Sequence, residues 1–141
     1  MTSADRDAIR QQLVAHEGLR LTVYKCSAGY LTVGVGRNLE GRGISKDEAF
    51  YLLDNDIRAC LDDLATFAWF GRLNAVRQRA VLDMRFQVGS GGFRAFKQML
   101  AALERGDYVA AAAAARDSKW ARVDSPARAT TVTRQLETGE A

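Results

Sequence analysis

The most constraining feature of this sequence is a short β-type segment enclosed by helical patterns. From Leu21 to Val35 the chain is rich in β-branched and aromatic residues, and the stretch KCSAG within it carries turn-forming residues. Such a run, divided by a turn, is typical of a β-hairpin. The glycines of GVGRNLEGRG indicate a further tight turn and a short third strand. We therefore expect a small antiparallel sheet near the N-terminus of an otherwise helical chain.

A helix is expected before this segment, from about Ser3 to Glu17. Ile9 and Leu13 have the i, i+4 spacing of a buried stripe, and Gly18 is placed to end the helix.

A long helix is expected after the segment. Ser45 and Glu48 have the spacing of a capping box, which marks a helix start. An apolar row then continues at intervals of four residues through Ala49, Leu53, Ile57 and Leu61.

The rest of the chain predicts a helical bundle. One helix should be capped by Asn74 and ended by Gly89, and a second, GFRAFKQMLAALERG, by Gly106. Asp107 should cap YVAAAAAARDSKW, and Ser125 should cap the last helix with Pro126 in its first turn. Apolar residues at helical spacing are expected in the core, among them Met84, Phe93, Phe96 and Met99.

These patterns predict an α+β, mostly helical fold in one domain of 141 residues. We expect a small N-terminal lobe with the β-hairpin, at about 1–58, and a larger helical lobe, at about 65–141. The long helix would join the lobes. A cleft between them is a natural place for a ligand.

Composition excludes several classes of function. The net charge of +3 is mild and its basic residues are scattered, so we expect no nucleic-acid partner. Cys26 and Cys60 form no disulfide framework and are expected to be reduced. With a single histidine, His16, no metal site of normal spacing can be assembled, and we expect no cofactor. The N-terminus carries no apolar signal and no segment is long enough for stable membrane insertion, so synthesis in a cytoplasm is expected.

Glu17, Cys26 and Thr32 are the candidate catalytic residues. The carbonyl dipoles at a helix C-terminus disfavour a carboxylate anion, so Glu17 is suited to act as a general acid. The hairpin can bring Cys26 and Thr32 back over that helix end. Residue types alone, however, favour ordinary roles, namely a solvated acid, a turn cysteine and a strand threonine.

A resemblance to a known family favours the catalytic roles over the ordinary ones. The segment EGLRLTVYKCSAGYLTVGVG resembles the catalytic segment of the phage-type lysozymes, glycoside hydrolase family 24, which carries Glu, then Asp or Cys, then Thr in a hairpin. The segments GISKDEAFYLLDNDI, FAWFGRLNAVRQRAVLDMRFQVG and DSKWARVDSPARA are also similar to family segments, so the likeness covers nearly the whole chain.

The resemblance implies a lysozyme-like fold and an endolysin, a muramidase that hydrolyses the β-1,4 bond between N-acetylmuramic acid and N-acetylglucosamine in bacterial peptidoglycan. Glu17 would protonate the glycosidic oxygen, and Thr32 would hold the attacking water. Cys26 departs from the acidic form of the motif, because a thiol near its usual pKa of about 8.5 is mostly neutral at pH 7. Cys26 is expected to polarise or position the water beside Thr32.

Three further residues match family positions. Arg128 matches an arginine that pairs with the catalytic Glu, while Phe86 and Gln87 match positions that line the groove. A surface role for Arg128 and plain helix packing for Phe86 and Gln87 are the competing interpretations. The resemblance also implies a monomer, made in the host cytoplasm and acting on the cell wall after release.

Two alternatives remain open. A lytic transglycosylase cleaves the same bond with a single acid and leaves an anhydro product. An inactive lysozyme-like module of a virion would bind peptidoglycan without cleaving it, although the presence of both Glu17 and Thr32 argues against this interpretation.

Overall fold

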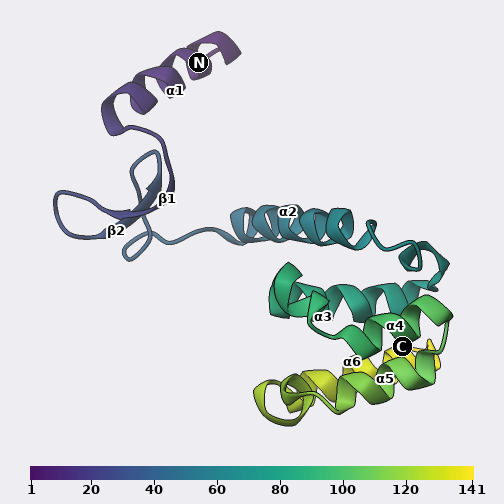
Figure 1. Cartoon of the computed structure of the whole chain (residues 1–141). Helices are drawn as coiled ribbons and strands as arrows, with labels where there is room; N and C mark the ends of the chain where they lie inside the picture. The colour runs from purple at the N-terminus through teal and green to yellow at the C-terminus, as the bar shows by residue number, and fades with distance from the viewer. The chain divides into compact units, whose positions relative to one another are not determined.

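The computed structural model describes residues 1–141 and shows an α+β fold in which helices predominate (Figure 1). In chain order the elements are α1 (Ser3–Glu17), β1 (Arg20–Lys25), β2 (Leu31–Gly34), β3 (Arg37–Asn38), α2 (Lys46–Leu64), η1 (Phe70–Arg72), α3 (Ala75–Arg94), α4 (Lys97–Arg105), α5 (Tyr108–Arg116), η2 (Trp120–Asp124) and α6 (Pro126–Thr138).

The chain divides into two structural units, Met1–Tyr51 and Leu52–Ala141, and the division falls within α2. The first unit holds α1 and the sheet, and the second holds the helical bundle. Each unit is described by itself below. No helix is long and apolar enough to cross a membrane.

The predicted hairpin and third strand are confirmed. The antiparallel order is β1-β2-β3, with Tyr24 opposite Thr32 and Val33 opposite Arg37. The register between β1 and β2 shifts between Arg20 and Tyr24, where β1 bulges. Because side chains alternate between the two faces of a strand, this register places Thr32 and Tyr24 on the same face.

The first helix has its predicted bounds, but its predicted buried stripe is wrong. No residue of α1 is buried, and Ile9 and Leu13 are 38% and 47% exposed. Within its own unit, nothing buries the apolar side chains of α1. The i, i+4 spacing indicated the helix correctly and its burial incorrectly.

The capping box at the start of α2 is confirmed. The Ser45 hydroxyl accepts from the Glu48 amide at 3.2 Å, and the Ser45 amide donates to Glu48 Oε2 at 2.7 Å. The buried residues of this helix are Cys60 and Leu64, and the predicted apolar row reaches towards Leu64.

Asn74 and Asp107 cap α3 and α5 as predicted, through side-chain bonds to backbone amides. Gly89 interrupts α3 with φ +74°, but the helix resumes beyond it as far as Arg94. Glycine allows this left-handed backbone, so the first helical segment of α3 ends at Gly89 as predicted, and a second segment follows it directly. A break at Ala95 and Phe96 then separates Arg94 from α4, which Gly106 ends in the left-handed conformation.

The core lies in the second unit. Met84, Phe93 and Met99 are almost completely buried, and Phe96 packs against them partly buried, as the sequence predicted. The other fully buried apolar residues come from every helix of this unit, including Leu64, Val81, Leu103, Val132 and Leu136. Ala111, Ala112 and Ala115 of α5 are buried because small side chains let α5 pack closely against α4 and α6.

Candidate active site

Glu17 is the last residue of α1, and its side chain is exposed. Gly18 ends the helix with φ +76°, and its amide donates to the Val14 carbonyl at 2.9 Å. The carboxylate lies against Gly36, since a Cβ built on Gly36 would be 2.9 Å from Glu17 Oε2. The helix end and the turn after β2 therefore meet at the carboxylate.

Cys26 begins the turn that joins β1 to β2. Its amide donates to the Tyr30 carbonyl at 3.0 Å, and its carbonyl accepts from the Gly29 amide at 2.8 Å. The side chain is partly exposed and forms no disulfide. The turn is thus closed by main-chain bonds, and its thiol is open to reagents and ligands.

The turn favours the ionised form of the thiol. The backbone amides of Tyr30 and Ala28 lower the pKa of Cys26, and desolvation opposes them. The Gly29 amide contributes a smaller effect in the lowering direction. N–H groups aimed at one atom stabilise a negative charge there, as in other anion-binding turns.

Thr32 lies on β2 and is 2% exposed. Its hydroxyl donates to the Tyr30 carbonyl at 2.9 Å. A hydroxyl has one proton and two lone pairs, so in this arrangement the oxygen of Thr32 is still able to accept. Thr32 and Cys26 therefore lie at the turn end of one hairpin, and both bond to the same residue, Tyr30.

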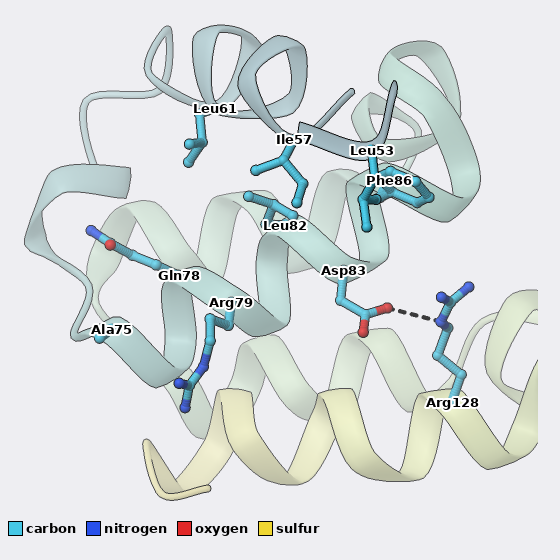
Figure 2. A pocket seen from close by; sticks show the side chains of 10 residues that line it. All are labelled: Leu53, Ile57, Leu61, Ala75, Gln78, Arg79, Leu82, Asp83, Phe86 and Arg128. Atoms are coloured by element: carbon cyan, nitrogen blue, oxygen red, sulfur yellow. Dashed lines mark ion pairs between the residues drawn. The ribbon is translucent and has the colours of Figure 1, made fainter. Parts of the chain in front are cut away.

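The other predicted residues belong to the second unit. Phe86 is 40% exposed and lines a pocket of about 560 Å³ formed by α2, α3 and α6 residues of this unit (Figure 2). Leu53, Ile57 and Leu61 of α2 and Leu82 of α3 provide the apolar part of the pocket. Phe86 lies in the wall of this pocket, and its role in a substrate groove stays a prediction.

Gln87, on the following position of α3, has a structural role within the second unit. Its Oε1 accepts from the Trp120 indole at 2.9 Å, and its Nε2 donates to the Ser125 hydroxyl at 2.5 Å. Ser125 occupies the N-cap position of α6 as predicted, although its side chain makes no hydrogen bond to the helix. Pro126 does occupy the first turn of α6, as predicted.

Arg128 forms an ion pair with Asp83 across the pocket, with its Nε 2.8 Å from Asp83 Oδ1 (Figure 2). Both side chains are nearly half exposed. Asp83 Oδ1 is itself covered and has no well-aligned hydrogen-bond donor, so charge attraction holds the pair. The predicted pairing of Arg128 with Glu17, a residue of the other unit, stays a prediction.

Sequence reasoning did not identify Gly36 or Asp83 as neighbours of the candidate residues. Gly36 was recognised only as part of a turn, because nothing local indicates which side chain would approach its missing Cβ. Asp83 lies one turn before Gln87 on α3, and only the position of α6 shows that Arg128 reaches it. Both contacts depend on tertiary structure.

Comparison with known proteins gives a consistent result. The family model named Phage lysozyme matches residues 14–137. The pre-baseplate central spike protein Gp5 of Enterobacteria phage T4 is 32% identical, over 94% of this chain and 28% of that protein. Two probable T4-type lysozymes of Dictyostelium discoideum are 25% and 24% identical, over 94% of this chain and 95% of each relative.

The chain thus spans about a quarter of the spike protein and nearly the full length of the two amoebal relatives. The matched range includes Glu17, Cys26 and Thr32 as well as Arg128. Because the family match covers most of the chain and agrees with the helical α+β fold, this protein belongs to the phage lysozyme family.

Proposed function

We propose that this chain is a muramidase, which hydrolyses the β-1,4 bond between N-acetylmuramic acid and N-acetylglucosamine in bacterial peptidoglycan. Membership of the phage lysozyme family supports a glycoside hydrolase whose substrate is peptidoglycan. The observation that carries the detailed proposal is the hairpin turn, where main-chain amides favour the Cys26 thiolate next to Thr32. The lowered pKa of Cys26 supports a thiolate as the group that takes the place of the second carboxylate.

In the proposed reaction Glu17 starts as the acid. It gives its proton to the glycosidic oxygen while the bond from that oxygen to the anomeric carbon breaks, and positive charge develops on the sugar ring. The Cys26 thiolate stabilises this charge and accepts a proton from the attacking water as the new bond to the anomeric carbon forms. The cycle ends with a Glu17 carboxylate, a Cys26 thiol and a reducing sugar end, and exchange with solvent restores the starting protonation.

Thr32 orients the water in this scheme. Its hydroxyl donates to the Tyr30 carbonyl and so presents a lone pair as an acceptor. A water that donates one hydrogen to Thr32 and the other to the thiolate has its own lone pair free for the sugar. The separation of two carboxylates that distinguishes inverting from retaining enzymes does not apply here, because only one of the two groups is a carboxylate.

Product chemistry tests this proposal against the enzymatic alternative. Purified peptidoglycan is digested, and the fragments are analysed by mass spectrometry after borohydride reduction. Hydrolysis gives a reducible N-acetylmuramic acid end. A 1,6-anhydro end, which resists reduction, would identify a lytic transglycosylase and refute the proposed hydrolysis.

The Glu17→Gln variant tests the assignment of the acid. The amide keeps the shape and lacks the proton to donate, so turbidity loss of permeabilised cells should fall to background. His16→Gln, at the neighbouring position on α1, serves as the control and should remain active. Lysis by Glu17→Gln at the wild-type rate would show that Glu17 is not the acid.

A virion-associated role is the second candidate, because one relative is a phage spike protein. We propose the free endolysin as the first choice, made in the host cytoplasm, acting as a monomer and released to the cell wall. Immunodetection in an induced culture distinguishes the two, since an endolysin appears in the lysate and is absent from purified particles. Detection in purified particles would support the virion role.

A further inference from the structure

The turn between β2 and β3 contacts both Glu17 and the start of α2, all within the first unit. We call Gly36 and Arg37 the β2–β3 corner. Gly36 has φ +65°, and a Cβ built on it would be 2.9 Å from Glu17 Oε2, so a side chain here would displace the carboxylate. Arg37 follows at once as the first residue of β3.

Arg37 is bound at both ends of its guanidinium. Its Nη1 and Nη2 donate to the two carboxylate oxygens of Glu48 at 3.1 and 2.6 Å, and Nη1 also donates to the Gly43 carbonyl at 3.2 Å. A two-bond fork of this kind fixes direction as well as distance, because the guanidinium is planar. The Arg37 side chain is three-quarters shielded from solvent.

Glu48 is in turn fixed by the start of α2. Its Oε2 accepts from the Ser45 amide in the capping box, so the carboxylate has little freedom to rotate. The hydrogen bond from Arg37, with the Ser45 amide and against desolvation, lowers the pKa of Glu48 to about 2. The fork is therefore fully charged at neutral pH.

We infer that Arg37 is a positioning residue for the general acid, holding the β2–β3 corner so that Gly36 forms the wall against which the Glu17 carboxylate lies. This inference rests on the proposed function, in which Glu17 is the acid. Glu17 ends an exposed helix, so without that wall its side chain would rotate freely in solvent. A fixed carboxylate matters because a displacement of about 1 Å in a reacting group can cost roughly 100-fold in rate.

Two glycines of the same strand region provide a matched test. Gly36→Ala places a methyl group 2.9 Å from Glu17 Oε2, so the carboxylate must move away. Gly34→Ala imposes the same kind of backbone strain, at φ +67°, but its methyl group has no atom within 4 Å. We expect Gly36→Ala to lower kcat at least tenfold relative to Gly34→Ala, with similar KM. Equal kcat for the two variants would overturn the role of the wall.

The Arg37 fork is tested by kinetics on soluble, uncrosslinked glycan strands. Arg37→Met removes the fork, and we expect kcat to fall about tenfold with KM changed by less than about twofold. Arg37→Lys keeps the charge without the fork, so its kcat should lie between those of the wild type and Arg37→Met. Arg10→Met, which removes an exposed ion pair on α1, should keep the wild-type kcat.

Loss of stability alone is controlled separately. Asp107→Ala removes the α5 cap in the second unit and serves as a destabilised control. A kcat of Arg37→Met equal to that of Asp107→Ala, at a temperature where both are folded, would overturn the inference. Glu17→Gln is assayed in parallel. Full activity of Glu17→Gln refutes the proposed acid itself, whereas an inactive Glu17→Gln beside an unaffected Arg37→Met refutes only the positioning role.

Discussion

The indole of Trp120 donates a 2.9 Å hydrogen bond to Gln87, and the same amide group donates to Ser125 from its other end. Gln87 thereby joins α3 to the short π-helix η2 and to Ser125, the residue that precedes α6. Trp120 is 5% exposed, so its indole N–H has few alternative partners. This bridge fixes the segment from which α6, with Arg128, begins.

Removing the bridge should destabilise the second unit. Gln87→Ala leaves the buried indole N–H unpaired, and we expect the free energy of unfolding to fall by about 1–3 kcal/mol in urea denaturation. In a double-mutant cycle with Trp120→Phe, the effect of Gln87→Ala should shrink by about 1 kcal/mol, since the donor is then absent. If Gln87 acts chiefly on the glycan, its replacement will instead raise KM and leave unfolding unchanged.

Cys26 should titrate as an unusually acidic thiol. Because the folded turn lowers its pKa, the alkylation rate with iodoacetamide should reach half its maximum at a lower pH than in the denatured chain. The buried Cys60 should react only after unfolding. Mass spectrometry of tryptic peptides separates the two sites, and identical titration of Cys26 in folded and denatured protein would contradict the effect of the turn.

Activity should follow the charge at position 26. Cys26→Asp supplies a negative group to the same amides and should retain much of the wild-type rate, whereas Cys26→Ala and Cys26→Ser should lose roughly 100-fold or more. The readout is kcat on soluble glycan strands. Wild-type activity of Cys26→Ala would mean that this position only completes the turn.

Asp63 should contribute to stability through two arginines. Arg85 and Arg94 donate to its two oxygens at 2.8 and 2.6 Å, and Asp63 and Arg85 are both largely buried. Asp63→Asn weakens both bonds, so we expect a loss of about 1–3 kcal/mol in the free energy of unfolding. Asp7→Asn, which breaks the exposed pair with Arg10, should change it by less than about 0.5 kcal/mol.

The same carboxylate predicts acid sensitivity. The hydrogen bond from Arg94, opposed by burial and aided by Arg85, holds the pKa of Asp63 well below its usual range. The stabilisation is therefore fully present above the unfolded pKa of about 3.9 and is lost as the pH falls through the lower folded value. Between neutral pH and pH 3, unfolding free energy should fall less for Asp63→Asn than for the wild type. Parallel curves for the two proteins would contradict this linkage.

Arg128 offers a test between its two interpretations. If Arg128 only pairs with Asp83, then Arg128→Met and Asp83→Asn should each cost at most about 1 kcal/mol, because both side chains are nearly half exposed. A role near the acid, as the family resemblance implies, adds a kinetic effect. We expect Arg128→Met to lower kcat at least tenfold and Asp83→Asn to leave it nearly unchanged. Equal kcat values for the two variants would mean that Arg128 only pairs with Asp83 and has no role near the acid.

Helix boundaries were predicted well where their signals are local. The capping box of Ser45 and Glu48 and the caps at Asn74 and Asp107 each involve residues within one turn, so sequence spacing is sufficient to identify them. Ser125 occupies the predicted N-cap position of α6, but its hydroxyl accepts from a distant residue, Gln87, and makes no bond to the helix. The buried stripe at Ile9 and Leu13 failed because spacing shows which residues share a face but not what covers that face.

The candidate site likewise has some features that local sequence predicts and others that depend on the folded structure. The motif identified Glu17, Cys26 and Thr32, and the hairpin that holds the last two was predictable from turn residues between β-branched runs. The acidity of the thiol was not, because it depends on amide directions that only the folded turn defines. The contact of Glu17 with Gly36 and the fork from Arg37 to Glu48 likewise join residues that the sequence separates.

The groups that favour an anion at Cys26 are mainly backbone amides. Every residue except proline supplies the same amide, so mutations of the side chains around the turn leave this electrostatic environment largely intact. An ancestral chain could then exchange an acid for a thiol at this position by substitution at one site, with no compensating change elsewhere. The occurrence of either residue within one family would then follow from the main chain of the turn and not from the side chains around it.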